Sequence, residues 1–258
     1  MTDPRNVLIT GCSSGIGKRL LDEFCGDKFR VIATARESKF EAFQSELRAR
    51  NRDVIPYKLD VTDLENGTQV IRDIEANYGG VDILINNAGI SYRTVVEEMS
   101  EPDEAIQMAT NYIGPMHLIR MVLPGMRRKK SGHIINISSV GGMMAMPTMS
   151  AYSASKFAIN GLTMSLADEY ASKGILINCV APGFIDIDKT STNHIETYRG
   201  EEISKDLANK VPLKRLGTPE EIARFICWLV SPDCSYINGQ VLTIDGGFIN
   251  SGSRGSLK

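Results

Sequence analysis

The sequence lacks the features that would place this protein across a membrane or on a nucleic acid. No apolar run approaches the roughly 18 residues that cross a bilayer. The start, MTDPRNVLIT, has an acid and a proline where a signal peptide needs a basic flank and an apolar stretch. Lys and Arg number 29 against 31 Asp and Glu, a formal net charge of -2, so no excess of one sign attracts nucleic acid or anionic lipid. We therefore expect a cytoplasmic protein that binds a small molecule.

Cysteine and histidine are too scattered for a disulfide framework or a metal site. The five cysteines are odd in number and show no C-x-x-C spacing, and the three histidines have no companion ligands nearby. We expect no metal ion, and reduced, mostly buried thiols. The cysteines are Cys12, Cys25, Cys179, Cys227 and Cys234, and the histidines are His117, His133 and His194.

What the sequence does contain is a regular alternation of short β-branched runs with longer helix-like stretches. Most of the runs are almost continuously apolar, as strands covered by helices on both faces are. The alternation predicts an α/β fold, a Rossmann-type doubly wound sheet of seven parallel strands with its ligand crevice beyond the carboxyl ends. The expected strands span 7–10, 30–35, 54–60, 81–87, 133–139, 176–182 and 240–245.

The chain shows no internal repeat and no Pro/Ser-rich linker that would divide it. At 258 residues it has the length of one large domain, so we expect residues 1–258 to form a single unit. Residues 184–215 interrupt the alternation, because they are polar at first and long for a simple connection. We expect them to form a flap on the substrate side.

A glycine-rich bend, LITGCSSGIGKRLL, follows the first expected strand and opens the first expected helix. The spacing is not G-x-G-x-x-G, yet the physical demands are similar. Glycine tolerates the φ values of the turn, lets the backbone approach a pyrophosphate, and leaves helix N-terminal amides facing that anion. A tight turn without a ligand is the alternative. The predicted phosphate-binding residues are Gly11, Ser13, Ser14, Gly15, Ile16 and Gly17.

The second expected strand ends in ATAR, where a dinucleotide-binding sheet usually meets the adenosine ribose. An acid there accepts from the 2′-hydroxyl, whereas an arginine suits a 2′-phosphate. Arg36 occupies this stretch, and no acid precedes Glu37. The sequence therefore favours NADP over NAD, with a merely solvated Arg36 as the alternative.

Tyr152 and Lys156 lie four residues apart in SAYSASK, at the start of an expected helix. Positions i and i+4 share one helix face, so the two head groups can converge. An ammonium about 5 Å from a phenol, at an effective dielectric near 20, favours the phenolate by about 3 kcal/mol, or roughly 2 pKa units. We predict a tyrosine whose pKa falls toward neutrality and that exchanges a proton with a carbonyl or alcohol oxygen. An ordinary surface pair is the alternative.

Taken together, these motifs identify the chain as resembling the short-chain dehydrogenase/reductase family. TGCSSGIG, NNAG at 86–89, Asn111, ISS at 137–139, YSASK at 152–156 and PG at 182–183 occur in the family's order and approximate spacing. The resemblance runs from Val7 to IDGGF at 244–248. The closing segments resemble those of 3-oxoacyl-thioester reductases and of sugar and small-alcohol dehydrogenases.

The resemblance implies a role for each matching residue. Ser139 is expected to hold the substrate oxygen, Tyr152 to act as acid and base, and Lys156 to bind the nicotinamide ribose as well as to tune the tyrosine. Asn111 is expected to support a water that relays protons to Lys156. The remaining cofactor-binding residues implied are Asp60 and Val61 near the adenine, Asn87, Ala88 and Gly89 beside the adenosine, and Pro182, Gly183 and Ile185 near the nicotinamide. The alternatives are that Asn87 is a plain turn former and that Asp60 is a helix cap or a strand-end carboxylate.

One departure from the family pattern concerns the loop after PG. Members often continue P-G-x-x-x-T, where the threonine hydroxyl reaches the nicotinamide carboxamide, but this chain has Ile187 at that position. Thr190 or the backbone amide of Ile187 could substitute.

From these observations we expect an NADP-dependent oxidoreductase that reduces a ketone or aldehyde to an alcohol. The family also implies a homo-oligomer, a dimer or commonly a homotetramer. Two alternatives stay open: an NAD-dependent alcohol or sugar dehydrogenase, and a dinucleotide-sensing scaffold whose catalysis has lapsed. The methionines of GGMMAMPTM, 141–149, either line an adaptable apolar substrate pocket or only pack a loop.

Overall fold

The computed structural model describes residues 3–24, 26–49, 54–187 and 201–251. Cys25, His194, Thr190 and most of the polar part of the expected flap therefore lie outside the described residues. Within them, seven strands form one all-parallel sheet in the order β3-β2-β1-β4-β5-β6-β7. The predicted Rossmann-type α/β fold is confirmed.

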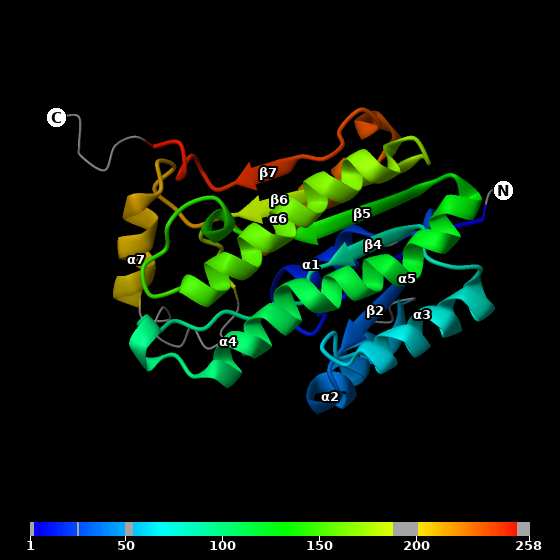
Figure 1. Ribbon diagram of the computed structural model, residues 1–258, viewed down its shortest axis with the longest axis horizontal. Helices are drawn as coiled ribbons and strands as arrows, with labels where there is room; N and C mark the ends of the chain where they lie inside the picture. Colours follow the sequence, from blue (N-terminus) through cyan, green and yellow to red (C-terminus); the bar gives the residue numbers. More distant parts are fainter. Residues whose placement is uncertain (1–2, 25, 50–53, 188–200, 252–258) are drawn as a thin grey trace.

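The strands all point toward one end of the molecule, where α4 and α7 lie (Figure 1). The strands are β1 Arg5–Ile9, β2 Phe29–Ala35, β3 Val54–Lys58, β4 Ile83–Asn86, β5 Gly132–Ile137, β6 Ile175–Pro182 and β7 Val241–Ile244. The helices are α1 Gly15–Glu23, α2 Glu37–Ala49, α3 Leu64–Tyr78, α4 Glu101–Met108, α5 Gly114–Lys129, α6 Ser150–Ala171, α7 Glu201–Lys210 and α8 Pro219–Leu229. Short helical turns cover Val96–Glu98 (η1), Ala109–Ile113 (η2), Val140–Gly142 (η3) and Pro232–Cys234 (η5).

Two apolar layers cover the sheet because successive strand residues face opposite sides. Val7 and Ile9 of β1 pack into a core shared with α1, α2 and α8. Leu8, between them, packs into the other core, which α3, α5 and α6 complete. Burial on both faces explains why the strands are apolar throughout, and it leaves the strand ends as the places where polar residues gather.

Several strands end earlier than the sequence indicated. The run 54–60 leaves the sheet after Lys58, and the run 133–139 leaves it after Ile137. The residues that follow, Asp60 and Ser139, turn out of the hydrogen-bonded ladder at the carboxyl end of the sheet. Their side chains are thereby free to serve a site instead of a core.

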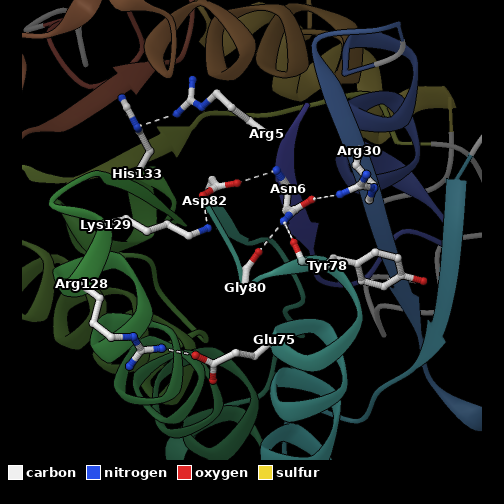
Figure 2. Close-up of polar contacts among 10 residues, drawn as sticks. All are labelled: Arg5, Asn6, Arg30, Glu75, Tyr78, Gly80, Asp82, Arg128, Lys129 and His133. Atoms are coloured by element: carbon white, nitrogen blue, oxygen red, sulfur yellow. Dashed lines mark hydrogen bonds and ion pairs between the residues drawn. The ribbon is translucent and has the colours of Figure 1, made fainter. Parts of the chain in front are cut away.

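The opposite, amino-terminal end of the sheet carries a network of polar contacts (Figure 2). Asn6 donates through Nδ2 to the carbonyls of Tyr78 (2.7 Å) and Gly80 (2.6 Å) and accepts at Oδ1 from Arg30 (2.9 Å). Asp82 accepts at Oδ2 from the backbone amide of Asn6 (2.8 Å). The side chain of Asn6 is thus fully used in joining β1 to β2 and to the connection before β4.

The basic run 127–130 ends α5 at this same end. Lys129 places its Nζ 2.6 Å from Oδ1 of Asp82, and Arg128 pairs with Glu75 of α3 (Figure 2). Asp82 and Glu75 neutralise part of the positive charge of residues 127–130, so this basic segment contributes to the stability of the fold. No described helix is long and apolar enough to cross a membrane.

Candidate active site

The glycine bend lies between β1 and α1, and two of its glycines, Gly11 and Gly17, leave no room for a side chain. Gly11 and Gly15 have φ values of +71° and +58°, which glycine adopts without strain. A Cβ on Gly11 would lie 2.9 Å from Cα of Ala88, and one on Gly17 would lie 2.2 Å from the carbonyl oxygen of Gly11. The glycines therefore let the bend fold against the end of β4 and let α1 start directly behind it.

The first turn of α1 is open toward the adjoining cavity. Ser14 occupies the N-cap position but makes no capping hydrogen bond with its side chain. N-terminal amides that lack a cap, together with the helix dipole, favour an anion. The bend can therefore cradle a phosphate group, as the sequence predicted.

Asn87 fixes the bend from the end of β4. Its Nδ2 donates to the carbonyls of Thr10 (2.8 Å) and Gly11 (3.0 Å). The backbone amides of Asn87 and Ala88 both donate to Oγ1 of Thr10, at 3.0 and 2.9 Å. Asn87 thus ties two strand ends together, and its role is larger than that of a turn former.

Two cations stand at the end of β2, where the sequence indicated only one. Arg36 and Lys39 both line the cavity, and Arg36 contributes to the lowering of the pKa of Lys39, after the larger effect of burial. The nearest acid, Glu37, is turned to the outside, where Oε1 lies 2.7 Å from Nζ of Lys58 on β3. The spacing R-x-x-K at the start of a helix was the signal that could have revealed Lys39.

Asp60 lies at the end of β3 beside the same part of the cavity. Its Oδ1 accepts from the backbone amide (2.9 Å) and the hydroxyl (2.7 Å) of Thr62. The helix α3 is capped instead by Asp63, whose side chain accepts from the amide of Asn66. Asp60 is therefore not a helix cap, whereas the other alternative, a carboxylate at a strand end, agrees with its place after β3.

Ser139, Tyr152 and Lys156 meet at the centre of the cavity. Ser139 follows β5 and begins the turn η3, where its Oγ accepts from the amide of Gly141 (3.1 Å). Tyr152 and Lys156 lie on the first two turns of α6, with Nζ of Lys156 5.7 Å from the centre of the tyrosine ring. The ammonium and the tyrosine ring thus lie on one face of α6, as the i, i+4 spacing predicted.

Lys156 is anchored in a buried position. Only 5% of the residue is exposed, and Nζ donates to the carbonyl oxygen of Ile137 at the end of β5 (2.8 Å). A Cβ on Gly89 would lie 3.5 Å from Nζ, so a glycine there keeps room beside the ammonium group. Burial lowers the pKa of Lys156 to about 8, although the Cys179 thiol acts in the opposite direction.

The expected fall of the Tyr152 pKa is not found. Burial raises the pKa of this phenol, and a hydrogen bond with the Ser139 hydroxyl opposes that rise. The reason is that the protein around both groups removes part of their hydration, and this desolvation penalises the charged form of each group. The phenol therefore keeps its proton at neutral pH.

Asn111 stands behind the cavity and does not line it. It belongs to the π-helical turn η2 and is 2% exposed. Its Oδ1 accepts from the amide of Ile90 (2.9 Å), while Nδ2 donates to the carbonyl of Ile90 (2.9 Å) and to Oγ of Ser155 (3.0 Å). Both side-chain protons are thus used within the protein, which makes the side chain of Asn111 a clamp between the chain after β4 and α6.

The chain after β6 covers the cavity from the other side. Pro182, Gly183 and Ile185 line it, and a Cβ on Gly183 would lie 2.7 Å from Cβ of Asp245. Ile187, where the family often has threonine, rests on the glycine bend, with Cγ2 3.3 Å from the position of a Cβ on Gly15. The side chain at this position therefore makes an apolar contact with the bend and offers no hydroxyl, unlike the threonine that the family often has there.

Together these elements enclose one cavity of about 480 Å³ along the carboxyl ends of the strands. It brings together all the predicted site residues except Asn111 and Gly17, which support its wall from behind. The predicted residues in the lining are Gly11, Ser13, Ser14, Gly15, Ile16, Arg36, Asp60, Val61, Asn87, Ala88, Gly89, Ser139, Tyr152, Lys156, Pro182, Gly183 and Ile185. Further lining residues that the sequence did not reveal include Lys39, Thr62, Ser91, Tyr92, Ile106 and Leu207.

The methionine-rich segment contributes to the apolar part of the lining. Met146 and Met149 both face the cavity. Within the described residues no group of three or more His, Cys, Asp or Glu side chains is arranged to hold a metal ion.

Comparisons with known proteins agree with this architecture. The family model described as short chain dehydrogenase matches residues 5–197. The chain is 36% identical to the 3-oxoacyl-(acyl-carrier-protein) reductase FabG of Thermotoga maritima over 243 residues, 94% of this chain and 96% of the relative. It is 39% identical to the reductase of the same name from Vibrio cholerae over 242 residues, 93% of this chain and 96% of the relative.

Solved structures show the same likeness. The structure of ElxO with NADP bound superimposes with a TM-score of 0.87 at 34% identity, over 96% of this chain and 99% of that one.

Proposed function

Because the chain belongs to the short-chain dehydrogenase/reductase family, we propose that it is an NADP-dependent oxidoreductase that reduces a ketone or aldehyde to an alcohol. One observation carries the proposal. The Ser139 hydroxyl, the Tyr152 phenol and the Lys156 ammonium line the same cavity as a glycine bend suited to a phosphate group. The similar proteins named reductases of 3-oxoacyl groups support the carbonyl class of substrate.

The preference for NADP rests on the two cations at the end of β2. Arg36 and Lys39 line the cavity beside the bend, and the acid that could accept from a ribose 2′-hydroxyl, Glu37, is engaged with Lys58. A 2′-phosphate supplies the negative charge that two adjacent cations favour. The similar structure that holds NADP agrees with this assignment.

The three central residues divide the work of the reaction. When bound, NADPH supplies the hydride. The Ser139 hydroxyl donates a hydrogen bond to the carbonyl oxygen and aligns it, and the Tyr152 phenol donates a proton to that oxygen as the alcohol forms. Lys156, held by the carbonyl of Ile137, offers its remaining protons to ribose hydroxyls and its charge to the phenolate left behind.

We also propose that the chain acts as one catalytic unit, located in the cytoplasm, and that it assembles as a homo-oligomer, a dimer or a tetramer. Phe157 and Met164 of α6 support the assembly, because they lie two turns apart on one helix and are 51% and 53% exposed. Exposed apolar pairs of this kind often mark a contact between subunits. Sedimentation of the purified protein measures the state, and a monomer at micromolar concentration contradicts the proposal.

The decisive experiment is a panel of ketones and aldehydes tested with NADPH and with NADH, using the wild type and the Arg36→Ala variant. We expect reduction with NADPH and a loss of about tenfold in the preference for NADPH in the variant, the effect of one charge-assisted contact. An unchanged preference assigns Arg36 to solvent and supports an NAD-dependent dehydrogenase. Tight binding of NADPH without any turnover supports a dinucleotide-sensing protein.

A further inference from the structure

A strained residue lies on the substrate side of the cavity, in the loop before α6. Thr148 has a φ of 65°, in the left-handed region that β-branched residues rarely occupy. Such a conformation is strained and persists only where the surrounding contacts hold it. The contacts of Thr148 therefore indicate what the strain maintains.

The hydroxyl of Thr148 donates to the carbonyl oxygen of Pro147 (2.5 Å), and two further contacts come from the loop that follows β4. The amide of Thr94 donates to the carbonyl oxygen of Thr148 (2.8 Å), and Nε of Arg93 donates to its Oγ1 (2.6 Å). We call these two hydrogen bonds the strap. They join two loops that are more than fifty residues apart in the sequence.

Each loop carries cavity-lining side chains directly beside the strap. Tyr92 precedes Arg93, and its backbone amide is fixed by Oε1 of the buried Gln107 (2.9 Å). Met146 and Met149 stand on either side of Thr148, and the amide of Met149 donates to the carbonyl of Met146 (3.1 Å). The strap therefore sets the separation between an aromatic wall and a methionine wall of one pocket.

Methionine side chains adapt readily to the shape of a ligand, so by themselves they discriminate weakly between substrates. A fixed distance between the two walls lets the pocket distinguish narrow from wide substrates. A substrate substituent wider than the space between Tyr92 and the methionines must break or distort the strap. We propose that Arg93 and Thr148 are specificity-determining positioning residues that limit the width of the apolar substituent beside the reacting carbonyl. This inference rests on the proposed function.

The test compares two ketones, one with an unbranched chain and one branched beside the carbonyl, both reduced with NADPH. The quantity measured is the ratio of kcat/KM for the unbranched ketone to that for the branched ketone. We expect Arg93→Ala and Thr148→Val each to lower this ratio about fivefold, mainly through a smaller KM for the branched ketone, as the loss of one hydrogen bond allows. The double variant should lower the ratio by less than the two single effects combined, since both changes remove the hydrogen bond between Arg93 and Thr148.

Two further variants distinguish this role from a general effect on folding. Thr148→Ser keeps the hydroxyl and should retain the wild-type ratio. Lys130→Gly relieves a comparable positive φ, 51°, at the C-terminus of α5 at the other end of the sheet, and should leave the ratio unchanged. The dissociation constant for NADPH should stay within twofold in all variants.

The outcomes separate the two proposals. A wild type that reduces no carbonyl compound overturns the proposed function and this inference with it. A wild type that reduces both ketones, with a ratio that Arg93→Ala and Thr148→Val leave unchanged or lower additively, overturns this inference alone.

Discussion

The two ends of the sheet are both polar, but they use their polar groups differently. At the amino-terminal end, the side chain of Asn6 and the carboxylate of Asp82 are taken up by protein partners (Figure 2). At the carboxyl end, Ser139, Tyr152 and Lys156 face a cavity. At both ends the polar residues lie where strands meet helices or loops. The comparison shows that polar residues at the end of a sheet form a binding site only where the chain leaves a cavity beside them.

The largest effect expected from this contrast is on turnover. Tyr152→Phe removes the proton donor, so kcat should fall about 10³-fold, while the dissociation constant for NADPH stays within threefold. The matched control is Tyr170→Phe, at the far end of the same helix α6. Steady-state kinetics and fluorescence titration measure the two quantities. Equal turnover in wild type and Tyr152→Phe would remove the phenol from the mechanism.

Two glycines, one at each end, sharpen the comparison. A Cβ on Gly17 would lie 2.2 Å from the carbonyl oxygen of Gly11, and one on Gly174 would lie 2.2 Å from that of Lys130. Each Gly→Ala change should lower the free energy of unfolding by about 3 kcal/mol and Tm by about 8 °C. Only the Gly17 variant should also weaken NADPH binding in the folded protein, by tenfold or more.

Gly161→Ala provides the control for these substitutions, because a Cβ there meets no atom within 4 Å. Within the helix α6 it should raise the free energy of unfolding by about 0.5–1 kcal/mol. Calorimetry and titration with NADPH test all three variants. Weakened NADPH binding in the Gly174 variant would contradict the conclusion that only the carboxyl end of the sheet binds the dinucleotide.

The amino-terminal end should give the protein a specific sensitivity to acid. His133 accepts at Nδ1 from Nη2 of Arg5 (2.8 Å), since arginine can only donate. Burial, and then the charge of Arg5, lowers the pKa of His133 from 6.5 to about 4. The unfolded chain therefore binds this proton more readily, and the associated stability, complete above pH 6.5, is lost as the pH falls toward 4.

We expect this loss to be about 2–3 kcal/mol in the free energy of unfolding. Urea denaturation at pH 7 and pH 4.5 measures it. In His133→Gln, which keeps a side-chain acceptor, the stability should fall less over this interval. An identical pH dependence in both proteins would place the acid sensitivity elsewhere.

The smallest effect concerns the outer edge of the carboxyl end. Lys39→Ala should raise the dissociation constant for NADP about fivefold and leave that for NAD unchanged, because a partly exposed cation contributes modestly. Lys58→Ala, which breaks the pair with Glu37 outside the cavity, is the control. Calorimetric titrations of each variant with NADP and with NAD measure these dissociation constants. If the Lys39→Ala variant loses as much affinity for NAD as for NADP, Lys39 does not recognise the 2′-phosphate.

The sequence by itself determined the elements and the local constellations. Apolar runs of strand length predicted the parallel sheet, since burial on both faces demands them. The i, i+4 spacing predicted that Tyr152 and Lys156 converge, because helix geometry is local. The glycines of the bend were recognised for a similar reason, as their φ values are a property of the turn.

Only the tertiary structure decided what depends on elements distant in the sequence. The pKa of Tyr152 rises with burial, which depends on the segments packed around α6 and which no local spacing records. Three other contacts likewise arise between segments that are distant in the sequence. They are the hydrogen bonds of the Asn111 side chain with Ile90 and Ser155, the contact of Ile187 with the glycine bend, and the strap on Thr148. The physical reason is that desolvation and hydrogen-bond partners are set by which surfaces meet, and that choice belongs to the fold as a whole.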